Sequence, residues 1–270
     1  MSALQTLNLR NAGITDVFYG SFVGCSALLT LDLRDNALGD TVCCSKFDGL
    51  TALQTLNLNN AGITSFASAS GAFSDLGAVT ELDLGGNTLG YIAAAAFLGF
   101  SALQTFDLRG LGITTMEGDV FQGCSSVTEL HLQGNPLRAI WSKAFSGLSS
   151  LETLDLSNLG IELIDSAAFP SGLLELDLGG NSLGDLWDGF FSGATNLHTV
   201  NFKDAGITSV GPGVWFNIPI DKLDMEGNSL GALPNDAFLL RDLRTLDLSN
   251  AGVTSLSTGA FQSCSGLTYL

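Results

Sequence analysis

The chain is 270 residues long, and 46% of its residues are hydrophobic while only 14% are charged. Its 27 acidic and 10 basic residues give a net charge of −17, which argues against nucleic acid as a partner because such binding needs clustered Lys and Arg. The longest apolar stretch, Leu89 to Phe100, is shorter than the roughly 20 residues of a membrane-spanning helix, so we expect no membrane insertion by this segment.

A leucine motif, L-x-x-L-x-L, recurs from end to end of the chain at intervals of 22 to 26 residues. A fixed period of this size predicts a solenoid, in which each repeat buries its apolar face against its neighbours. We therefore expect a single domain over residues 1–270, with eleven complete repeats and the start of a twelfth at Leu267.

Within each repeat, the motif alternates apolar and polar residues, which is typical of a half-buried strand. In chain order, we expect strands at residues 4–9, 28–33, 53–58, 79–84, 103–108, 127–132, 151–156, 173–178, 197–202, 220–225 and 243–248. These strands should stack into one parallel sheet. After each strand come a polar turn and then, in most repeats, a Phe such as Phe22 or Phe145. The Phe segment is expected to form a short helical or 3₁₀ turn, which the alanine run Ala93–Ala96 favours.

These features resemble the leucine-rich repeat family, whose consensus is L-x-x-L-x-L-x-x-N-x-L followed by a Phe. The period of about 24 residues resembles the typical class of extracellular proteins, and the stretch Ala260–Leu267 resembles BspA-like microbial surface repeats. The resemblance implies an α/β, horseshoe-shaped solenoid with a parallel sheet on the concave face, short helical or 3₁₀ turns on the convex face, and ligand binding on the concave face. The family's extracellular members often carry cysteine-rich caps, and none is visible here. We therefore expect a domain uncapped at both ends, belonging to a longer protein.

The Asn of the family consensus occurs in every second repeat. The structural residues expected from it are Asn36, Asn87, Asn135, Asn181 and Asn228. The intervening repeats have Ala or Leu followed by Gly, as at Ala12-Gly13. Losing a buried Asn without replacement would leave backbone groups unpaired, so the regular alternation predicts that these turns are closed in another way, with Gly at positive φ.

The residue before the third Leu of each motif should point outward, about 4.8 Å from its counterpart on the next strand. Most members of this column are Asp or Asn, which predicts an acidic ladder on the concave face. The candidate ligand-binding residues are Asp83, Asp107, His131, Asp155 and Asp177 of this column and Glu129, Glu175 and Arg109 beside it. Stacked carboxylates favour a bound cation. A competing interpretation makes the Asp structural, through a local hydrogen bond, with Arg109 neutralising part of the field.

Three of the five cysteines, Cys25, Cys124 and Cys264, follow a core Phe by three residues. They take the place of a buried apolar residue, so we expect them to be buried and reduced. Cys43 and Cys44 are adjacent, which leaves a vicinal disulfide or a metal site open. No other Cys or His has metal-ligand spacing to this pair, so we favour inert thiols and predict neither a metal nor a cofactor.

No P-loop, nucleophile elbow or dinucleotide fingerprint appears, and there are only two histidines. We therefore expect no enzyme but a recognition scaffold that binds a protein or glycan, basic or hydroxyl-rich, on its concave face. The alternative is a structural spacer or adhesion repeat with no specific ligand in this segment. The resemblance implies an extracellular or cell-surface location, whereas the lack of an N-x-S/T sequon and of a disulfide pattern keeps a cytoplasmic one open.

Overall fold

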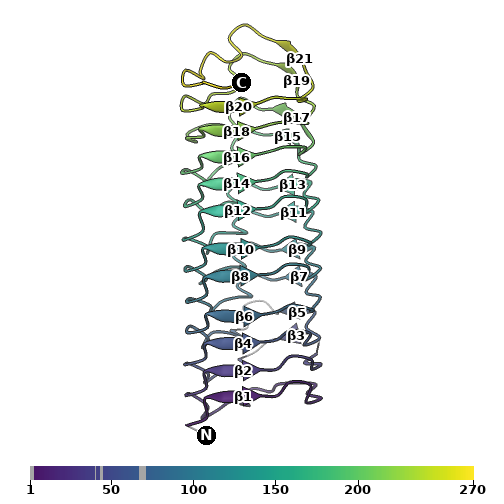
Figure 1. The fold of residues 1–270 in the computed structure, drawn as a ribbon, viewed down its shortest axis with the longest axis vertical. Helices are drawn as coiled ribbons and strands as arrows, with labels where there is room; N and C mark the ends of the chain where they lie inside the picture. The colour runs from purple at the N-terminus through teal and green to yellow at the C-terminus, as the bar shows by residue number, and fades with distance from the viewer. Residues whose placement is uncertain (1–2, 40, 43–44, 67–70) are drawn as a thin grey trace. The chain divides into compact units, whose positions relative to one another are not determined.

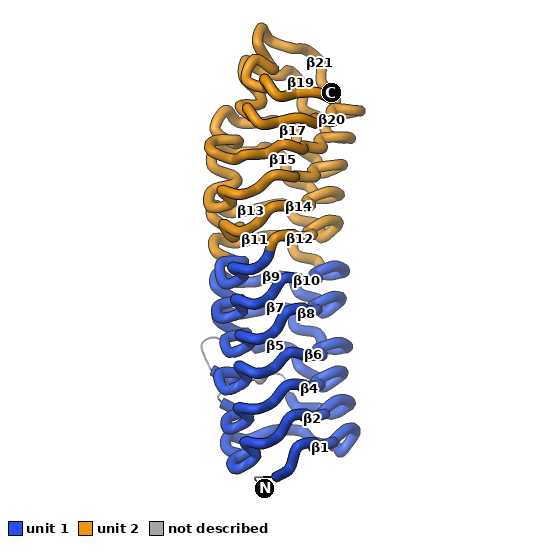
Figure 2. Tube along the Cα trace, turned by 60° about the vertical axis from the view of Figure 1, so that its left-hand side comes forward, with its two compact units in different colours: residues 1–135, 144–151 blue, residues 136–143, 152–270 orange. Residues whose placement is uncertain are grey.

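The structure, a computed structural model, describes residues 3–39, 41–42, 45–66 and 71–270. Regular structure in this part of the chain consists of short β-strands joined by turns (Figure 1). The chain divides into two compact units, residues 1–135 with 144–151 and residues 136–143 with 152–270 (Figure 2). A helix that could cross a bilayer does not occur among the described residues.

Each repeat contributes one three-residue strand to a parallel array, which we call the main sheet of each unit; in the first unit its hydrogen bonds form a four-stranded and a two-stranded part. In the first unit, these strands are β1 (Thr6–Asn8), β2 (Thr30–Asp32), β4 (Thr55–Asn57) and β6 (Glu81–Asp83), paired in that order, and the pair β8 (Thr105–Asp107) and β10 (Glu129–His131). In the second unit, they are β12 (Thr153–Asp155), β14 (Glu175–Asp177), β16 (Thr199–Asn201), β18 (Lys222–Asp224) and β20 (Thr245–Asp247). The register aligns equivalent residues, for example Leu7 with Leu31. The predicted parallel-strand solenoid is confirmed.

A second set of parallel strands, which the sequence did not predict, follows the turn after each main-sheet strand from β2 onward. In the first unit, it is β3 (Thr41–Val42), β5 (Ser65–Phe66), β7 (Tyr91–Ile92) and β9 (Thr115–Met116). In the second unit, it is the pairs β11 (Ala139–Ile140) with β13 (Leu163–Ile164), β15 (Gly184–Leu186) with β17 (Ile207–Val210), and β19 (Gly231–Leu233) with β21 (Val253–Leu256). These two- to four-residue strands add a second hydrogen-bonded ladder to each unit.

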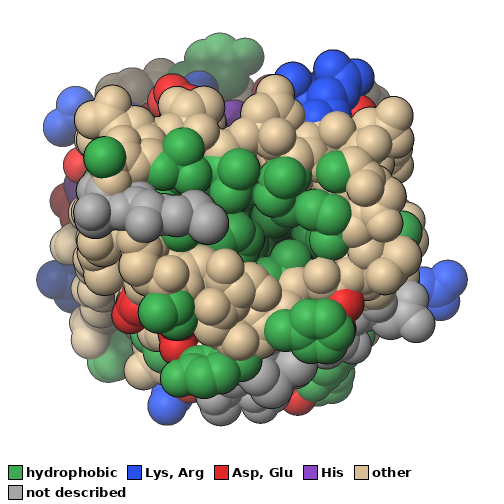
Figure 3. All heavy atoms as spheres, turned by 90° about the horizontal axis from the view of Figure 1, so that it is seen from below, with side chains coloured by type: hydrophobic (Ala, Val, Ile, Leu, Met, Phe, Trp, Pro, Cys, Tyr) green, Lys and Arg blue, Asp and Glu red, His purple; other side chains and the backbone are tan. Residues whose placement is uncertain are grey.

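The core of each unit lies inside the turns of the chain. The central leucines of the strands, such as Leu56 and Leu154, are completely buried. Phenylalanines from successive repeats stack on one another, with ring centroids 6.1 Å apart for Phe22 and Phe47 and 5.7 Å apart for Phe47 and Phe73. Seen from the end of the first unit that carries β1, hydrophobic side chains fill the middle and polar groups surround them (Figure 3). Each repeat therefore buries its apolar side chains mainly against the next repeat.

The prediction of helical or 3₁₀ turns in the Phe segments is wrong for the described residues. In the alanine run Ala93–Ala96, Ala95 has a φ of 54°, which a right-handed helix does not allow. The Ala95 N–H donates to the carbonyl of Asp119 at 3.0 Å, and the Phe97 N–H donates to that of Val120 at 3.4 Å. These donors bind the neighbouring repeat rather than a carbonyl four residues back, so the segment consists of separate turns.

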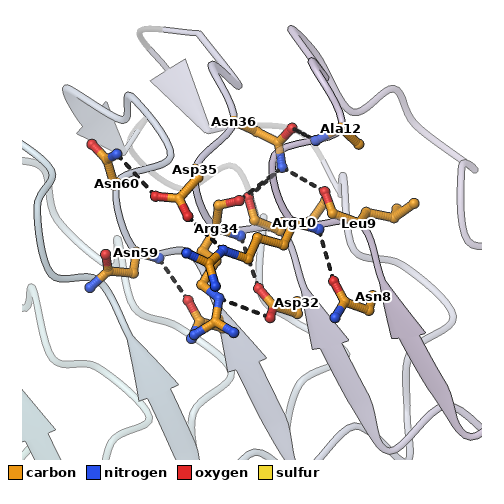
Figure 4. Close-up of polar contacts among 12 residues, drawn as sticks. Asn8, Leu9, Arg10, Ala12, Asp32, Arg34, Asp35, Asn36, Asn59 and Asn60 are labelled. Atoms are coloured by element: carbon orange, nitrogen blue, oxygen red, sulfur yellow. Dashed lines mark hydrogen bonds and ion pairs between the residues drawn. The ribbon is translucent and has the colours of Figure 1, made fainter.

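The buried asparagines connect pairs of repeats. The Asn36 side-chain oxygen accepts the N–H groups of Ala12 at 3.1 Å and Ile14 at 3.0 Å, both in the preceding repeat. Its amide nitrogen donates to the carbonyl of Leu9 at 2.9 Å and, within its own repeat, to that of Leu33 at 2.7 Å (Figure 4). One Asn therefore satisfies backbone groups of two consecutive repeats.

The same arrangement recurs in both units. The asparagines that bridge to the preceding repeat in this way are Asn87, Asn135, Asn181 and Asn228. Each preceding repeat is one of those with Gly in the turn, and that Gly has positive φ, as at Gly62 with 69°. A Cβ at Gly206 would lie 3.2 Å from the Cα of Ser182, so Gly also allows the two backbones to approach closely. This sharing explains why every second repeat can lack the Asn.

Candidate ligand-binding face

The main sheet of each unit has one outward face, which is the face that the sequence reading placed on the concave side. In each three-residue strand, the middle side chain points into the core, while the first and third point outward. In β8, for example, Phe106 is 1% exposed while Thr105 and Asp107 lie at the surface. We call the first and third residues of the main-sheet strands, with the residue two positions further on, the main-sheet face of each unit.

The carboxylates of the column have a structural role. The Asp107 Oδ1 accepts the backbone N–H of Arg109 at 3.0 Å, and the Asp177 Oδ1 accepts that of Gly179 at 2.8 Å. The same bond, from the N–H two residues further on, is made to Asn8, Asp32, Asn57, Asp83, Asp155, Asn201, Asp224 and Asp247. This is the local hydrogen bond that the competing interpretation expected. In each carboxylate of the column, one oxygen accepts this bond where the chain leaves the strand, and the negative charge stays at the surface.

In the first unit, the structure brings together Asp107, Arg109, Glu129 and His131. The register of β8 and β10 places Glu129 beside Thr105 and His131 beside Asp107. The Arg109 guanidinium binds Asp107 through Nε at 2.9 Å and Nη2 at 2.5 Å, and this hydrogen bond is the main reason that the pKa of Asp107 is lowered. His131 Nε2 lies 3.9 Å from the Glu129 carboxylate. The acidic column is therefore partly neutralised at this position.

A hollow of about 510 Å³ lies on the same face, across β4, β6 and β8. Its polar lining includes the hydroxyls of Thr55 and Thr105 and the carboxylates of Glu81, Asp83 and Asp107. A smaller hollow of about 210 Å³ adjoins Asp83 and Asp107 at the end of the strands, next to Arg109. Hydroxyls and carboxylates with so little cationic charge suit a ligand that donates hydrogen bonds or carries positive charge.

In the second unit, the register aligns Asp155 with Asp177 and Thr153 with Glu175. These four residues line a hollow of about 240 Å³, together with Thr199 and Asn201. The Asn201 amide donates to Asp177 Oδ2 at 2.9 Å, so both oxygens of Asp177 have partners. The predicted residues of this unit thus form one compact acidic patch.

A second acidic group of this unit was not singled out from the sequence. Oxygens of Asp224, Glu226 and Asp247 all lie within 4.8 Å of one another, a geometry that could hold a metal ion. The Lys203 ammonium lies 2.6 Å from Glu226 and supplies positive charge here, and the Glu226 carboxylate raises the pKa of Lys203. The sequence did carry a signal for the Lys203–Glu226 ion pair. The two residues occupy the same outward position in consecutive repeats, so their opposite charges could be expected to lie close together.

The structure tests the prediction of buried, reduced thiols for three of the five cysteines. Cys25, Cys124 and Cys264 are free thiols and are buried. Burial raises the pKa of Cys124 to about 12. Cys43 and Cys44 lie outside the described residues.

The fold is similar to that of several receptor structures. A TLR13–ssRNA13 complex has 23% sequence identity and a TM-score of 0.67, and the match covers 90% of this chain and 39% of that chain. The plant peptide hormone receptor RGFR1 in complex with RGF2 has 21% identity and a TM-score of 0.54, and the match covers 100% of this chain and 44% of that chain. The glycosylated Toll–Spatzle complex of Drosophila has 20% identity and a TM-score of 0.60, and the match covers 99% of this chain and 33% of that chain. The chain spans less than half the length of each.

At these identities the likeness concerns the fold alone. A comparison with curated proteins finds no match. The family described as "Leucine rich repeat" matches residues 2–63, 102–161 and 219–270, which is more than half of the sequence. Together with the L-x-x-L-x-L strands and the bridging asparagines, this match shows that the chain belongs to the leucine-rich repeat family.

Proposed function

We propose that this chain is a non-catalytic recognition scaffold that binds a protein or glycan ligand through its main-sheet faces. The observation that carries the proposal is the hollow across β4, β6 and β8, where Glu81, Asp83 and Asp107 meet the hydroxyls of Thr55 and Thr105. A surface of this kind recognises ammonium or guanidinium groups by charge and hydroxyl groups by hydrogen bonds. The ligand-binding residues are then Asp83, Asp107, Arg109, Glu129 and His131 in the first unit and Asp155, Asp177 and Glu175 in the second.

The charge of the chain supports a basic or hydroxyl-rich partner. A net charge of −17 repels polyanions and attracts cations over the Debye length of about 8–10 Å. The TLR13 structure is a complex with ssRNA13, RGFR1 is in complex with RGF2, and Toll is in complex with Spatzle. Those ligands differ widely, so the surface chemistry of this chain is the better guide, and it disfavours nucleic acid.

We further propose that residues 1–270 act as one leucine-rich repeat domain of a longer extracellular or cell-surface protein. The likeness to receptor structures of greater length supports this proposal. The competing function is a spacer or adhesion repeat with no ligand of its own. It is favoured by the local hydrogen bonds of the column, because a carboxylate such as that of Asp155 already has a structural task.

The experiment compares two sets of substitutions in binding to a partner captured from a cell-surface extract and then purified. The first set, called the column variants, consists of two double variants, Asp83→Asn with Asp107→Asn and Asp155→Asn with Asp177→Asn. Each substitution keeps the hydrogen-bond acceptor of the column residue and removes its charge. The second, Asp48→Asn with Glu162→Gln, removes charge away from the main-sheet faces.

Affinity is measured at low and high salt. We expect the column variants to lose affinity and salt dependence, while the control variants keep both. Equal affinities for the native protein and for correctly folded column variants would place binding outside the main-sheet faces, and the capture of no partner would favour the spacer.

A further inference from the structure

A second surface, separate from the main-sheet faces, departs from the repeat pattern. Each repeat of the chain has a position directly after the core aromatic residue of its Phe segment. It is polar in six repeats, at Asp48, Ser74, Gln122, Ser146, Ser192 and Gln262, and apolar in isolated repeats at Val23, Leu98 and Pro170. Phe216 and Leu239 occupy it in two successive repeats of the second unit, and their exposed fractions are 74% and 41%. Two large, exposed apolar side chains therefore follow one another in neighbouring repeats here.

These side chains border a hollow of about 550 Å³, whose lining also includes Ile218 and Pro219. This volume lies in the range of about 300–1,000 Å³ that ligand sites usually have. The floor is rigid, because Trp215 is 1% exposed and its indole N–H donates to the carbonyl of Ala237 at 3.0 Å. The Trp215 ring also lies 5.8 Å from that of Phe191, in a stacked arrangement.

One cationic side chain, that of Arg241, lines this hollow. Arg241 and Asp242 complete the lining, and within the described part of the chain the Arg241 side chain makes no hydrogen bond or ion pair. Of the other arginines, Arg10, Arg34 and Arg109 pair with carboxylates, and Arg241 is the one that lines this hollow. A guanidinium beside an apolar hollow can bind a carboxylate, since its fork matches the two oxygens of that group.

We propose that this hollow is a docking site for a peptide segment that carries apolar side chains next to a carboxylate. The apolar side chains fill the space between Phe216, Ile218 and Leu239, and the carboxylate binds Arg241. Exposed aromatic residues with an adjacent Arg are the residue types that dominate binding energy at protein interfaces. Asp242 on the same lining disfavours a polyanion, so a single carboxylate fits better than an anionic membrane surface or a nucleic acid.

The test uses a matched pair of probes, acetyl-Gly-Phe-Glu-Leu-Gly-amide and the same peptide with Gln in place of Glu, with binding followed by calorimetry. We expect the Glu peptide to bind the full chain saturably and at least about fivefold more tightly than the Gln peptide. Arg241→Gln should abolish this preference, because the two changes remove the same contact. Phe216→Ala should weaken both peptides equally. Arg138→Gln and Gln122→Ala, which alter exposed residues away from the hollow, are the controls.

Several results would overturn the proposal. One is equal binding of the two peptides to the native chain, or no binding of either. Another is an equal loss on Arg138→Gln, which would show a general charge effect. Association of the native chain that Phe216→Ala abolishes would assign the surface to a second copy. Binding to phosphatidylcholine–phosphatidylserine vesicles that Phe216→Ala abolishes would assign it to a membrane. The column variants described above do not alter the lining of this hollow, so the two proposals fail independently.

Discussion

The side-chain oxygen of Asn87 accepts the backbone N–H of Ile63, in the preceding repeat, at 2.9 Å. The same oxygen accepts the N–H of Ala61 at 3.1 Å, and the amide nitrogen donates to the carbonyls of Leu58 at 2.8 Å and Leu84 at 2.7 Å. Because these groups are buried, losing the Asn side chain leaves them without their hydrogen-bond partner. The functional unit of stability is thus a pair of repeats joined by one Asn.

Asn87→Ala should therefore lower the free energy of unfolding by about 3 kcal/mol or more, since each unsatisfied buried group costs roughly 1–3 kcal/mol. The measurement is urea denaturation followed by circular dichroism. Asn59→Ala is the control, because its amide makes an exposed bond to Asp83 at 3.1 Å, and it should cost less than about 1 kcal/mol. Equal midpoints for the two variants would contradict the bridging role.

Removing a stacked Phe should be equally severe for a different reason. Phe145 is completely buried, and its ring stacks on that of Phe121 at 6.1 Å. Phe145→Ala should cost about 3–5 kcal/mol through the cavity that it leaves. Gln122→Ala, at the surface of the same unit, should change stability by no more than about 0.5 kcal/mol. A smaller loss of stability for Phe145→Ala than for Gln122→Ala would show that Phe145 does not lie in the core.

The buried Cys124 thiol makes the protein sensitive to alkali. Its pKa is raised to about 12 by burial, from an ordinary value of 9.0, so the folded state favours the neutral thiol. This contribution to stability is complete below pH 9 and is lost as the pH rises toward 12. The stability difference between the native chain and Cys124→Ala should then shrink between these values, as urea midpoints at successive pH values would show. Parallel pH profiles would argue against a buried thiol.

The Asp107–Arg109 pair should be visible in a titration. The Arg109 hydrogen bond lowers the pKa of Asp107 below its ordinary 3.8. The stability from this pair is present above that ordinary value and is lost as the pH falls through the lowered one, and it is small because both side chains are exposed. In NMR titrations, Arg109→Gln should therefore raise the pKa of Asp107, because it removes the hydrogen bond that lowers it. An unchanged pKa would show that the pair does not persist in solution.

Much of the fold could be predicted because the strand pattern is explicit in the sequence. The leucine positions alternate with polar ones in each repeat, so the parallel strands follow from the pattern, although the strand expected at 173–178 is shorter in the structure, at Glu175–Asp177. The second set of strands could not be predicted in this way. A strand such as Ser65–Phe66 has only two residues, which is too short to show a period.

The helical turns were mispredicted because alanine propensity is a weak local preference. In the segment around Ala95, hydrogen bonds to the next repeat outweigh it and hold that residue at positive φ. For the candidate site, the outward column was predictable from alternation. The Arg109–Asp107 pairing follows from the two-residue spacing, as the competing interpretation expected. The unpaired state of Arg241 could not be predicted, because it depends on side-chain rotamers that the sequence does not encode.

The most direct test of the proposed recognition surface is carboxylate footprinting of the chain with and without its purified partner. A carbodiimide and glycine ethyl ester modify exposed Asp and Glu, and mass spectrometry locates each modified residue. We expect the partner to protect Asp83, Asp107, Asp155 and Asp177, while Asp48 and Glu162 react equally in both samples. Protection confined to Asp48 or Glu162, with the four column residues unchanged, would contradict binding through the main-sheet faces.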